Sequence, residues 1–592
     1  MTNLTLELFN AVESKISKET KPYVSKQEGL IIMPDALWAK NDILNFYQKN
    51  RLDGNSLNKT FYQNWEKVKN LSLEERFFDQ IFHYMSTYGT NFQTDMYIPN
   101  EQFGLPKDMK LKFKVVFGLS KEELITKSLD ILKSGIALKE ETIDQLINLV
   151  HDSGYVFTGK EGIKNKEAIV KIADLFGAFP DEPQEFLRYL VFKATDQTLL
   201  IKNDRLIKEI KSSNFSPVYA LQKYDLKQLA EIFNRFKPIF LAFKRGNAKS
   251  YINKISRLSK TYHKPLVANA LNEVTQRKLE KSDMHWLENA TPYALFKALN
   301  ACNARANGQS AFLYQIRNGR SWAKWVNKTD VNQEIASYNL DLIVNFLQKK
   351  YDFSGKKFYI PKNVEYALPS SEKMFVGNVP VGSRFYAKRL AVGVYWENAW
   401  GARDLDLSAV NIGGKVGWNA SYNQNRGALM HSGDITNATN GAVEYLRSNG
   451  KNIEPSLVMN NVFSGDENSG YKIIIGKGEK ISREYMMQPK NLFVDIKTEM
   501  IQKQVILGLI MMRNEKQCFV LMNSSQGNKS VSSYNDVAKA TIQALYEKFQ
   551  NFFTLNDLIE LLGGEVVKSN DESVDYNFSL EDIQKDSFIS LF

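Results

Sequence analysis

Apolar residues recur at two different spacings in two parts of this chain. Between residues 119 and 350 they recur every three or four positions, which places them on one side of a helix. Between residues 384 and 523 short apolar runs alternate with turns, as in antiparallel strands. The pattern therefore predicts an α+β, multidomain chain, with an N-terminal all-α helical region, a C-terminal β-sandwich, and a helix with an acidic tail after it.

Breaks in the pattern predict where the segments begin and end. Asn318 and Gly319 separate two short alternating runs, which is a strong hairpin signal. Residues rich in Pro, Gly and Ser precede the strands and predict a linker. The expected segments are a helical region (1–118), a basic helical domain (119–350) with a hairpin near 314–325, a linker (351–383), the sandwich (384–530), C-terminal helices (531–567) and a flexible acidic tail (568–592).

The last two segments carry separate hypotheses about packing. Within residues 533–552, apolar side chains including Ile542, Leu545 and Phe549 recur at helical spacing, so this helix is predicted to cover the sandwich of its own chain. The tail is predicted to reach away from it. Because exposed apolar clusters usually mark contact sites, Phe588, Leu591 and Phe592 are predicted to dock on another subunit or a partner protein.

Composition changes this picture in three ways. With 592 residues, 43% of them hydrophobic, the chain is expected to be globular. The first residues do not read as a secretory signal, and no apolar run approaches the roughly 18 residues of a membrane span, so a cytoplasmic location is expected. The two cysteines, Cys302 and Cys518, exclude a disulfide framework and a Cys-rich zinc site.

Catalytic motifs are not recognisable in the sequence. The segment 470–478 resembles a phosphate-binding loop, but it has five residues between its first glycines and lacks the Ser or Thr that would hold Mg²⁺. Cys302 could act as a nucleophile, yet on an apolar helix it reads more simply as a small core residue. A non-enzymatic protein is therefore predicted.

The candidate chemistry lies in two acidic motifs. Asp404 and Asp406 are two positions apart in a strand-like stretch, so they face the same side. A turn that contains His431, Gly433 and Asp434 follows, and together these carboxylates could surround a hard cation such as Ca²⁺. The alternative is that Asp404 and Asp434 cap tight turns through hydrogen bonds to the backbone.

These two motifs, in this order, resemble the TerD-type domain of tellurium-resistance and general stress proteins, over roughly residues 380–525. The resemblance implies a calcium-binding β-sandwich with Asp404, Asp406, Asp434 and Glu444 as ligands, and with Asn437 and Asn440 as neutral oxygen donors. Family members usually show an acidic run after the turn, whereas this chain keeps only Glu444 in register. Because affinity follows ligand charge, the predicted site is a degenerate one.

Charge is distributed unevenly along the chain. The formal net charge is +11, yet residues 232–272 contain no acidic residue. Basic residues there alternate with Phe243, Tyr251 and Tyr262, a combination of charge and stacking surfaces that suits nucleic acid or another polyanion. The alternative is a solvated helix face. The predicted contact residues are Arg235, Lys237, Lys244, Arg245, Lys249, Lys254, Arg257, Lys260 and Lys264.

Two functional hypotheses follow from the sequence. The first is a non-enzymatic, cytoplasmic, bacterial stress-response protein with a TerD-like binding or sensing module that is linked to calcium and self-assembles through protein–protein contacts. The second is a nucleic-acid-binding protein that uses residues 235–264, for example in phage or stress defence.

Overall fold

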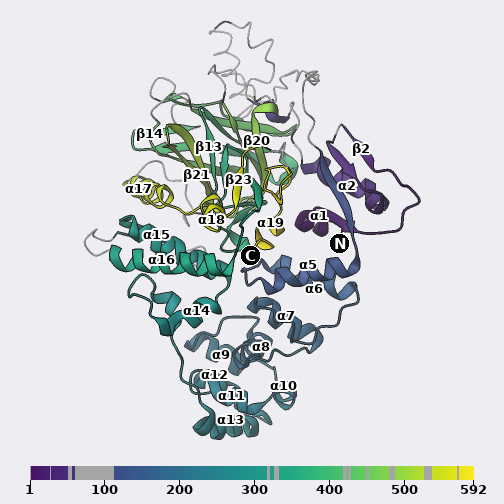
Figure 1. Cartoon of the computed structure of the whole chain (residues 1–592), viewed down its shortest axis with the longest axis vertical. Helices are drawn as coiled ribbons and strands as arrows, with labels where there is room; N and C mark the ends of the chain where they lie inside the picture. The colour runs from purple at the N-terminus through teal and green to yellow at the C-terminus, as the bar shows by residue number, and fades with distance from the viewer. Residues whose placement is uncertain are drawn as a thin grey trace.

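The computed structural model describes residues 2–60 apart from 27, 51 and 53–55, residue 72, and residues 113–592 apart from 316–320, 326–331, 418–422, 425–427, 449–452, 479–486, 488, 526–535 and 570–572. Figure 1 shows sheets at one end of the molecule and helices at the other. Mixed α and β structure is thus confirmed. No helix in these residues is long and apolar enough to cross a membrane.

Two antiparallel sheets form the β region, residues 364–525. The first has seven strands in the order β14-β13-β18-β21-β22-β11-β8, and the second has six in the order β15-β16-β17-β12-β19-β20. Their bounds are β8 Val364–Glu365, β11 Arg384–Ala387, β12 Leu390–Trp396, β13 Ala402–Asn411, β14 Gly414–Gly417, β15 Asn423–Gln424, β16 Leu429–His431, β17 Ala442–Ser448, β18 Ser456–Gly465, β19 Gly470–Lys477, β20 Leu492–Glu499, β21 Gln504–Arg513 and β22 Lys516–Ser525.

A shared apolar core joins the two sheets. Val392 and Val394 of β12 lie in the same buried cluster as Leu405 and Leu407 of β13, which belong to the other sheet. Alternate residues of these strands turn the other way and are also covered, so several strands are buried along their whole length. This double burial explains why the strands read as nearly continuous apolar runs.

Helix α17 (Asp536–Gln550) covers the outer face of the seven-stranded sheet. Its Ile542, Leu545 and Phe549 pack on a buried cluster from strands including β18 and β21, which confirms the predicted packing on the same chain. The fully buried guanidinium of Arg384, on β11, donates hydrogen bonds to the carbonyl oxygens of Phe549 at 2.8 Å and Phe552 at 2.9 Å. These bonds hold the C-terminal end of α17 against the sheet.

The N-terminal region is not all-α as predicted. It contains a four-stranded sheet in the order β1-β4-β3-β2, in which β1 and β3 both run parallel to β4. Strands as short as these leave little alternation to detect, and β4 lies about a hundred positions after β1 in the chain. The strand bounds are β1 Ala11–Glu13, β2 Tyr23–Ser25, β3 Leu30–Ile32 and β4 Lys114–Leu119.

Between the two sheet regions the chain is helical, and an antiparallel strand pair, β5 (Ala311–Gln315) and β6 (Ser321–Trp325), lies before its last helix, α16. The strands agree with the predicted hairpin, while the predicted turn at Asn318 and Gly319 lies outside the described residues. Helices α8 to α13 have a core of their own at the end of the molecule farthest from the β region (Figure 1). The remaining helices are α1 Thr2–Phe9, α2 Lys40–Asn50, α5 Lys121–Lys133, α6 Glu140–Asp152, α7 Lys166–Phe176, α8 Pro183–Thr195, α9 Asp204–Ser212, α10 Val218–Lys223, α11 Leu226–Ile232, α12 Lys237–Ala242, α13 Ala248–Tyr262, α14 Met284–Glu288, α15 Pro292–Ala306, α16 Gln333–Lys350, α18 Leu555–Leu561 and α19 Lys585–Ile589.

The predicted linker, residues 351–383, is instead part of the folded core. Strand β7 (Lys357–Tyr359) lies between β23 (Glu565–Val567) and β24 (Tyr576–Asn577) and runs parallel to both. The linker prediction rested on Pro, Gly and Ser content, and it missed that this strand finds its partners near the other end of the chain.

The predicted free tail, in its described residues 573–592, packs on its own chain, so the prediction that Phe588, Leu591 and Phe592 dock on another subunit or partner is wrong. Phe588 is 1% exposed, and its ring lies 5.3 Å from that of Phe578 and 5.7 Å from that of Phe375. Leu591 is buried too, and Phe592 packs edge-on against Phe296. The apolar terminus that suggested a contact site is an internal contact.

The tail should therefore be required for stability. Replacing Phe588 with Ala is expected to lower the free energy of unfolding by about 3–5 kcal/mol, because it removes a buried ring and leaves a cavity. Chemical denaturation of the full chain measures this. Phe463→Ala, at a ring that is 51% exposed, is the matched control and should have a small effect; equal effects of the two substitutions would contradict the buried position of the tail.

Candidate metal centre

The centre is built on β13, before the part of the strand that pairs with β14 in the described residues. Strand β14 pairs there with residues 408–411 of β13, while β18 pairs along the other edge and shifts register near Asp404. Leu405 and Leu407 face the core between the sheets. Asp404 and Asp406 face the other way, as their spacing predicts.

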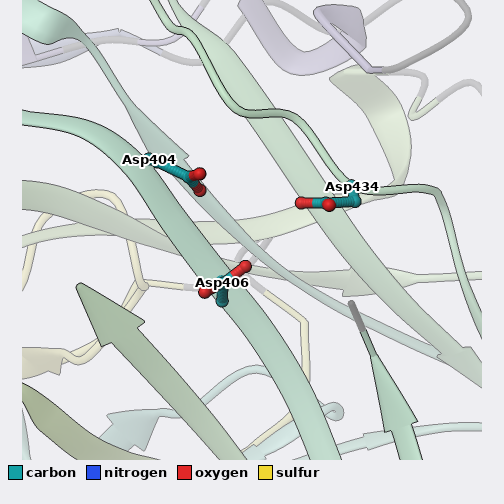
Figure 2. Close-up of side chains that lie close together, drawn as sticks. All are labelled: Asp404, Asp406 and Asp434. Atoms are coloured by element: carbon teal, nitrogen blue, oxygen red, sulfur yellow. The ribbon is translucent and has the colours of Figure 1, made fainter. Parts of the chain in front are cut away.

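Asp434 completes a group of three carboxylates. It follows β16 on a turn where Gly433 has a φ of 107°, a conformation that suits glycine. One carboxylate oxygen from each of Asp404, Asp406 and Asp434 lies within 4.8 Å of the other two, and all three residues are buried. Figure 2 shows Asp404 and Asp406 on the strand and Asp434 on the loop, with their side chains turned toward one another.

Burial and mutual repulsion both disfavour charge on these carboxyl groups. Burial raises the pKa of Asp404 to about 8, and the nearby carboxylates of Glu444 and Asp434 contribute to the rise. Burial raises the pKa of Asp406 to about 9, with Glu444 and Asp404 as further causes. Burial raises the pKa of Asp434 too. pKa shifts this large are typical of functional sites in which like charges lie close together, and metal sites are one example.

Glu444 holds the centre together from a different position. This residue of β17 is fully buried; its Oε2 accepts a hydrogen bond from the Leu407 N–H and its Oε1 one from the Ile435 N–H, both at 2.9 Å. It thereby ties the Asp434 loop to β13. Each of its oxygens accepts one backbone N–H, and it is not one of the three grouped carboxylates, which fits a positioning role; its role as a ligand, which the resemblance implies, stays a prediction.

His431 supports the same turn. Its Nδ1 accepts a hydrogen bond from the Gly433 N–H at 3.1 Å, and its Nε2 lies 3.3 Å from Glu444 Oε2. Burial lowers the pKa of His431 to about 4, so the ring is neutral at ordinary pH. Both nitrogens face groups of the protein, which leaves the oxygen atoms of the aspartates as the available ligands.

The two neutral donors expected from the sequence are exposed, whereas the three aspartates are buried. Asn437 Oδ1 accepts from Asn398 and from Thr439, and the backbone oxygen of Asn440 accepts from Lys59. Sequence reasoning missed Asn461, which lies directly across from Asp406 in β18 and is 1% exposed. Its signal was visible: two adjacent asparagines interrupt an otherwise apolar strand.

Buried oxygen atoms without partners suit the site to a cation. Among the residues that the structure describes, Oδ1 of Asp404, Oδ1 of Asp434, Oγ1 of Thr436 and Oδ1 of Asn461 are buried and have no hydrogen-bond donor. Buried polar atoms are normally satisfied, so each of these calls for a ligand. The donors are all oxygen, which matches the preference of a hard divalent cation.

The other predicted site residues do not join this centre. The nine basic residues lie on or beside α12 and α13, at the far end of the molecule (Figure 1). Cys302 is fully buried in α15, and burial raises the pKa of its thiol to about 11, as expected for a core residue and not for a nucleophile.

No family model, curated protein or solved structure matches this chain, so its residues and their geometry carry the functional argument.

The raised pKa values predict a pH-dependent response to cations. In the unfolded chain these carboxyls ionise near their ordinary pKa, about 3.9, whereas in the ion-free fold Asp404 and Asp406 keep protons up to about pH 8 and 9. Because the folded state then binds more protons, its free energy of unfolding falls as pH rises through this window. A bound cation replaces those protons, so its stabilising effect should grow with pH.

Thermal unfolding of the full chain with chelator and with excess Ca²⁺ tests this expectation. The difference in Tm between the two conditions should be larger at about pH 8 than at about pH 5. A difference that stays constant, or that shrinks as pH rises, would show that the bound ion does not displace these protons.

Glu444→Gln tests the positioning role. An amide retains one acceptor oxygen, so either the Leu407 or the Ile435 N–H loses its partner, which is expected to cost about 1–3 kcal/mol of stability. The loosened Asp434 loop should also weaken cation binding, measured by calorimetry. Glu467→Gln, at an exposed position in the same sheet region, should change neither quantity; unaltered binding in Glu444→Gln would remove Glu444 from the centre.

Proposed function

We propose that this chain is a non-enzymatic, cation-responsive protein in which Asp404, Asp406 and Asp434 bind Ca²⁺. The observation that carries the proposal is the burial of three carboxylates within 4.8 Å of one another, with unpartnered oxygen atoms among them. Such a group cannot remain fully charged without a counter-ion, because the Coulomb repulsion between desolvated charges is large. A divalent cation supplies that counter-charge.

The chemistry of the site favours Ca²⁺ over other divalent ions. Zn²⁺ prefers thiolate or imidazole ligands, and both ring nitrogens of His431 face protein groups. Mg²⁺ usually retains several of its waters and binds through one or two carboxylates, whereas Ca²⁺ accepts six to eight protein oxygens in flexible geometry. Three aspartates, with Thr436 and Asn461 as neutral donors, correspond better to the second pattern.

The resemblance to TerD-type domains also supports Ca²⁺ in this proposal. It supplies the expectation of a calcium-binding β-sandwich in a bacterial stress-response protein, and the order of β13 and the Asp434 turn is the feature that supports it. In this proposal the β region is the sensing module. Cation binding changes how firmly the Asp434 loop is held against β13, because the loop contributes one of the three ligands.

Calorimetric titration of the full chain with Ca²⁺ is the direct test. We expect one site with a dissociation constant on the order of 10⁻⁵ to 10⁻³ M, weaker than a site with more acidic ligands. Asp406→Asn should abolish the heat without lowering the Tm of the ion-free protein at about pH 8, since the carboxyl is then largely protonated.

Asp466→Asn, at an exposed position in the turn between β18 and β19, is the matched control and should bind Ca²⁺ as the parent does. If the aspartates only cap turns, the parent chain gives no heat and no thermal shift at millimolar Ca²⁺, while Asp404→Asn and Asp434→Asn lower the Tm whether or not the ion is present. That result would end the metal proposal.

A further inference from the structure

A second charged feature lies at the opposite end of the molecule from the carboxylates (Figure 1). It consists of exposed basic side chains on α12, on α13 and in the loop between them, and we call it the basic track. Its members are Lys237, Lys244, Lys249, Lys254, Arg257 and Lys260. Among the described residues none of the six forms an ion pair, whereas the neighbouring Lys264 is paired with Glu231 at 2.8 Å.

The exposed side of α13 is polar from Lys249 to Thr261, and Tyr262 at the end of the helix is exposed too. Its buried side is formed by Ala248, Ile252, Ile255 and Ser259. The exposed positions between residues 249 and 261 are Lys249, Ser250, Lys254, Arg257, Lys260 and Thr261. From Lys249 to Lys260 the helix rises about 16 Å, long enough to follow several phosphates of a strand. Residues 232–272, which contain the track, include no acidic residue.

Two of the predicted contact residues have a different role. Arg245 donates hydrogen bonds to the carbonyl oxygens of Lys211 at 2.6 Å and Phe215 at 3.0 Å, so it fixes the loop between α12 and α13. Arg235 donates to Gln184 at 3.0 Å. Both are half-buried, and they support the track without being part of it.

Base stacking is limited on this surface. Phe243 is fully buried and Tyr251 packs against the core of this helical end, so neither offers a face to a base. Tyr262, at 39% exposed, is the aromatic side chain of the predicted set that reaches solvent. Contacts to phosphate must therefore dominate over contacts to bases.

We propose that the basic track binds the phosphate backbone of nucleic acid, with little dependence on base sequence. The exposed positions of α13 from Lys249 to Thr261 are all polar, which favours this partner over an anionic membrane, because membrane binding requires apolar side chains that enter the lipid. The exposed apolar side chains nearest in the chain are Leu241 of α12, and Leu266 and Val267 beyond the end of α13. The inference is independent of the metal centre.

Fluorescence anisotropy of a labelled oligonucleotide with the full chain tests the proposal, with single-stranded and duplex forms of several sequences. If all six cations contact phosphates, the logarithm of the association constant should fall with the logarithm of salt concentration with a slope of about −4 to −5 between roughly 50 and 200 mM. Affinity should differ little among sequences. No binding at low salt, or binding without salt dependence, overturns the proposal.

Charge reversal localises the contact. Exchanging Lys249, Lys254, Arg257 and Lys260 for Glu should reduce affinity at least about tenfold and flatten the salt slope, because four phosphate contacts become repulsive. The control reverses four exposed lysines of the β region and its edges, Lys362, Lys388, Lys477 and Lys490, which gives the same change in net charge. Equal losses in the two proteins would mean that net charge, and not the track, attracts the oligonucleotide.

Two further measurements make the result unambiguous. Circular dichroism and thermal unfolding show whether the reversed protein is folded, and the same four exchanges to Gln give a milder variant that should show a smaller loss of the same kind. Flotation with vesicles of anionic lipid tests the other partner. Vesicle binding that Leu266→Asp with Val267→Asp abolishes, together with no oligonucleotide binding, would assign the surface to membranes and overturn the proposal.

Discussion

Repulsion among buried carboxylates is the constraint on which the β13 region depends. Three of them lie within 4.8 Å of one another, and a fourth, Glu444, is buried beside them. Among the described residues, two cations act on these carboxyls: Arg403 lowers the pKa of Asp404 only in part, and Lys415 beside Asp406 is half-buried, with its own pKa lowered by burial. In the proposed function the group has two low-energy states, one protonated and one bound to a cation, and the pH and the free cation concentration select between them.

The sequence predicted the parts of this centre that depend on short spacing. Two aspartates separated by one residue in a strand must share a side, and a Gly-Asp turn after the next strands brings Asp434 into reach. Asn461 and the role of Glu444 depend on longer relations. Asn461 faces Asp406 because of one register of β18 with β13, near a bulge. Glu444 Oε1 accepts a hydrogen bond from the Ile435 N–H. This contact depends on how the Asp434 loop folds, and the spacing of residues along the chain does not predict it.

The same distinction explains which parts of the fold were predicted. Helix α17 and the hairpin follow from local periodicity, and both form. The tail was predicted to be free because its acidic residues appeared unpaired, yet Asp586 lies 3.2 Å from Lys127 and Asp575 lies 3.1 Å from Lys356. Lys585 donates to Glu372 at 3.0 Å, a pair buried between the tail and the helices. Composition cannot identify partners that lie hundreds of positions away. The tail was therefore predicted to be solvated, although Asp575, Lys585 and Asp586 form ion pairs within the fold.

The basic track and the buried aspartates differ in their effect on the stability of the fold. This difference decides how strongly each feature indicates a ligand. An exposed lysine keeps its hydration and affects stability by little, so six of them on α12 and α13 are compatible with a merely solvated surface. Their arrangement carries the inference: six exposed cations on adjoining elements, no acidic residue in the same 41-residue window (232–272) and only polar side chains at the exposed positions of α13 from Lys249 to Thr261. A buried carboxylate, by contrast, destabilises the fold unless something compensates for it. For Asp404, Asp406 and Asp434 the burial itself is the evidence. Three buried carboxylates that are all charged destabilise the fold, so they require either a bound cation or protons to reduce their repulsion.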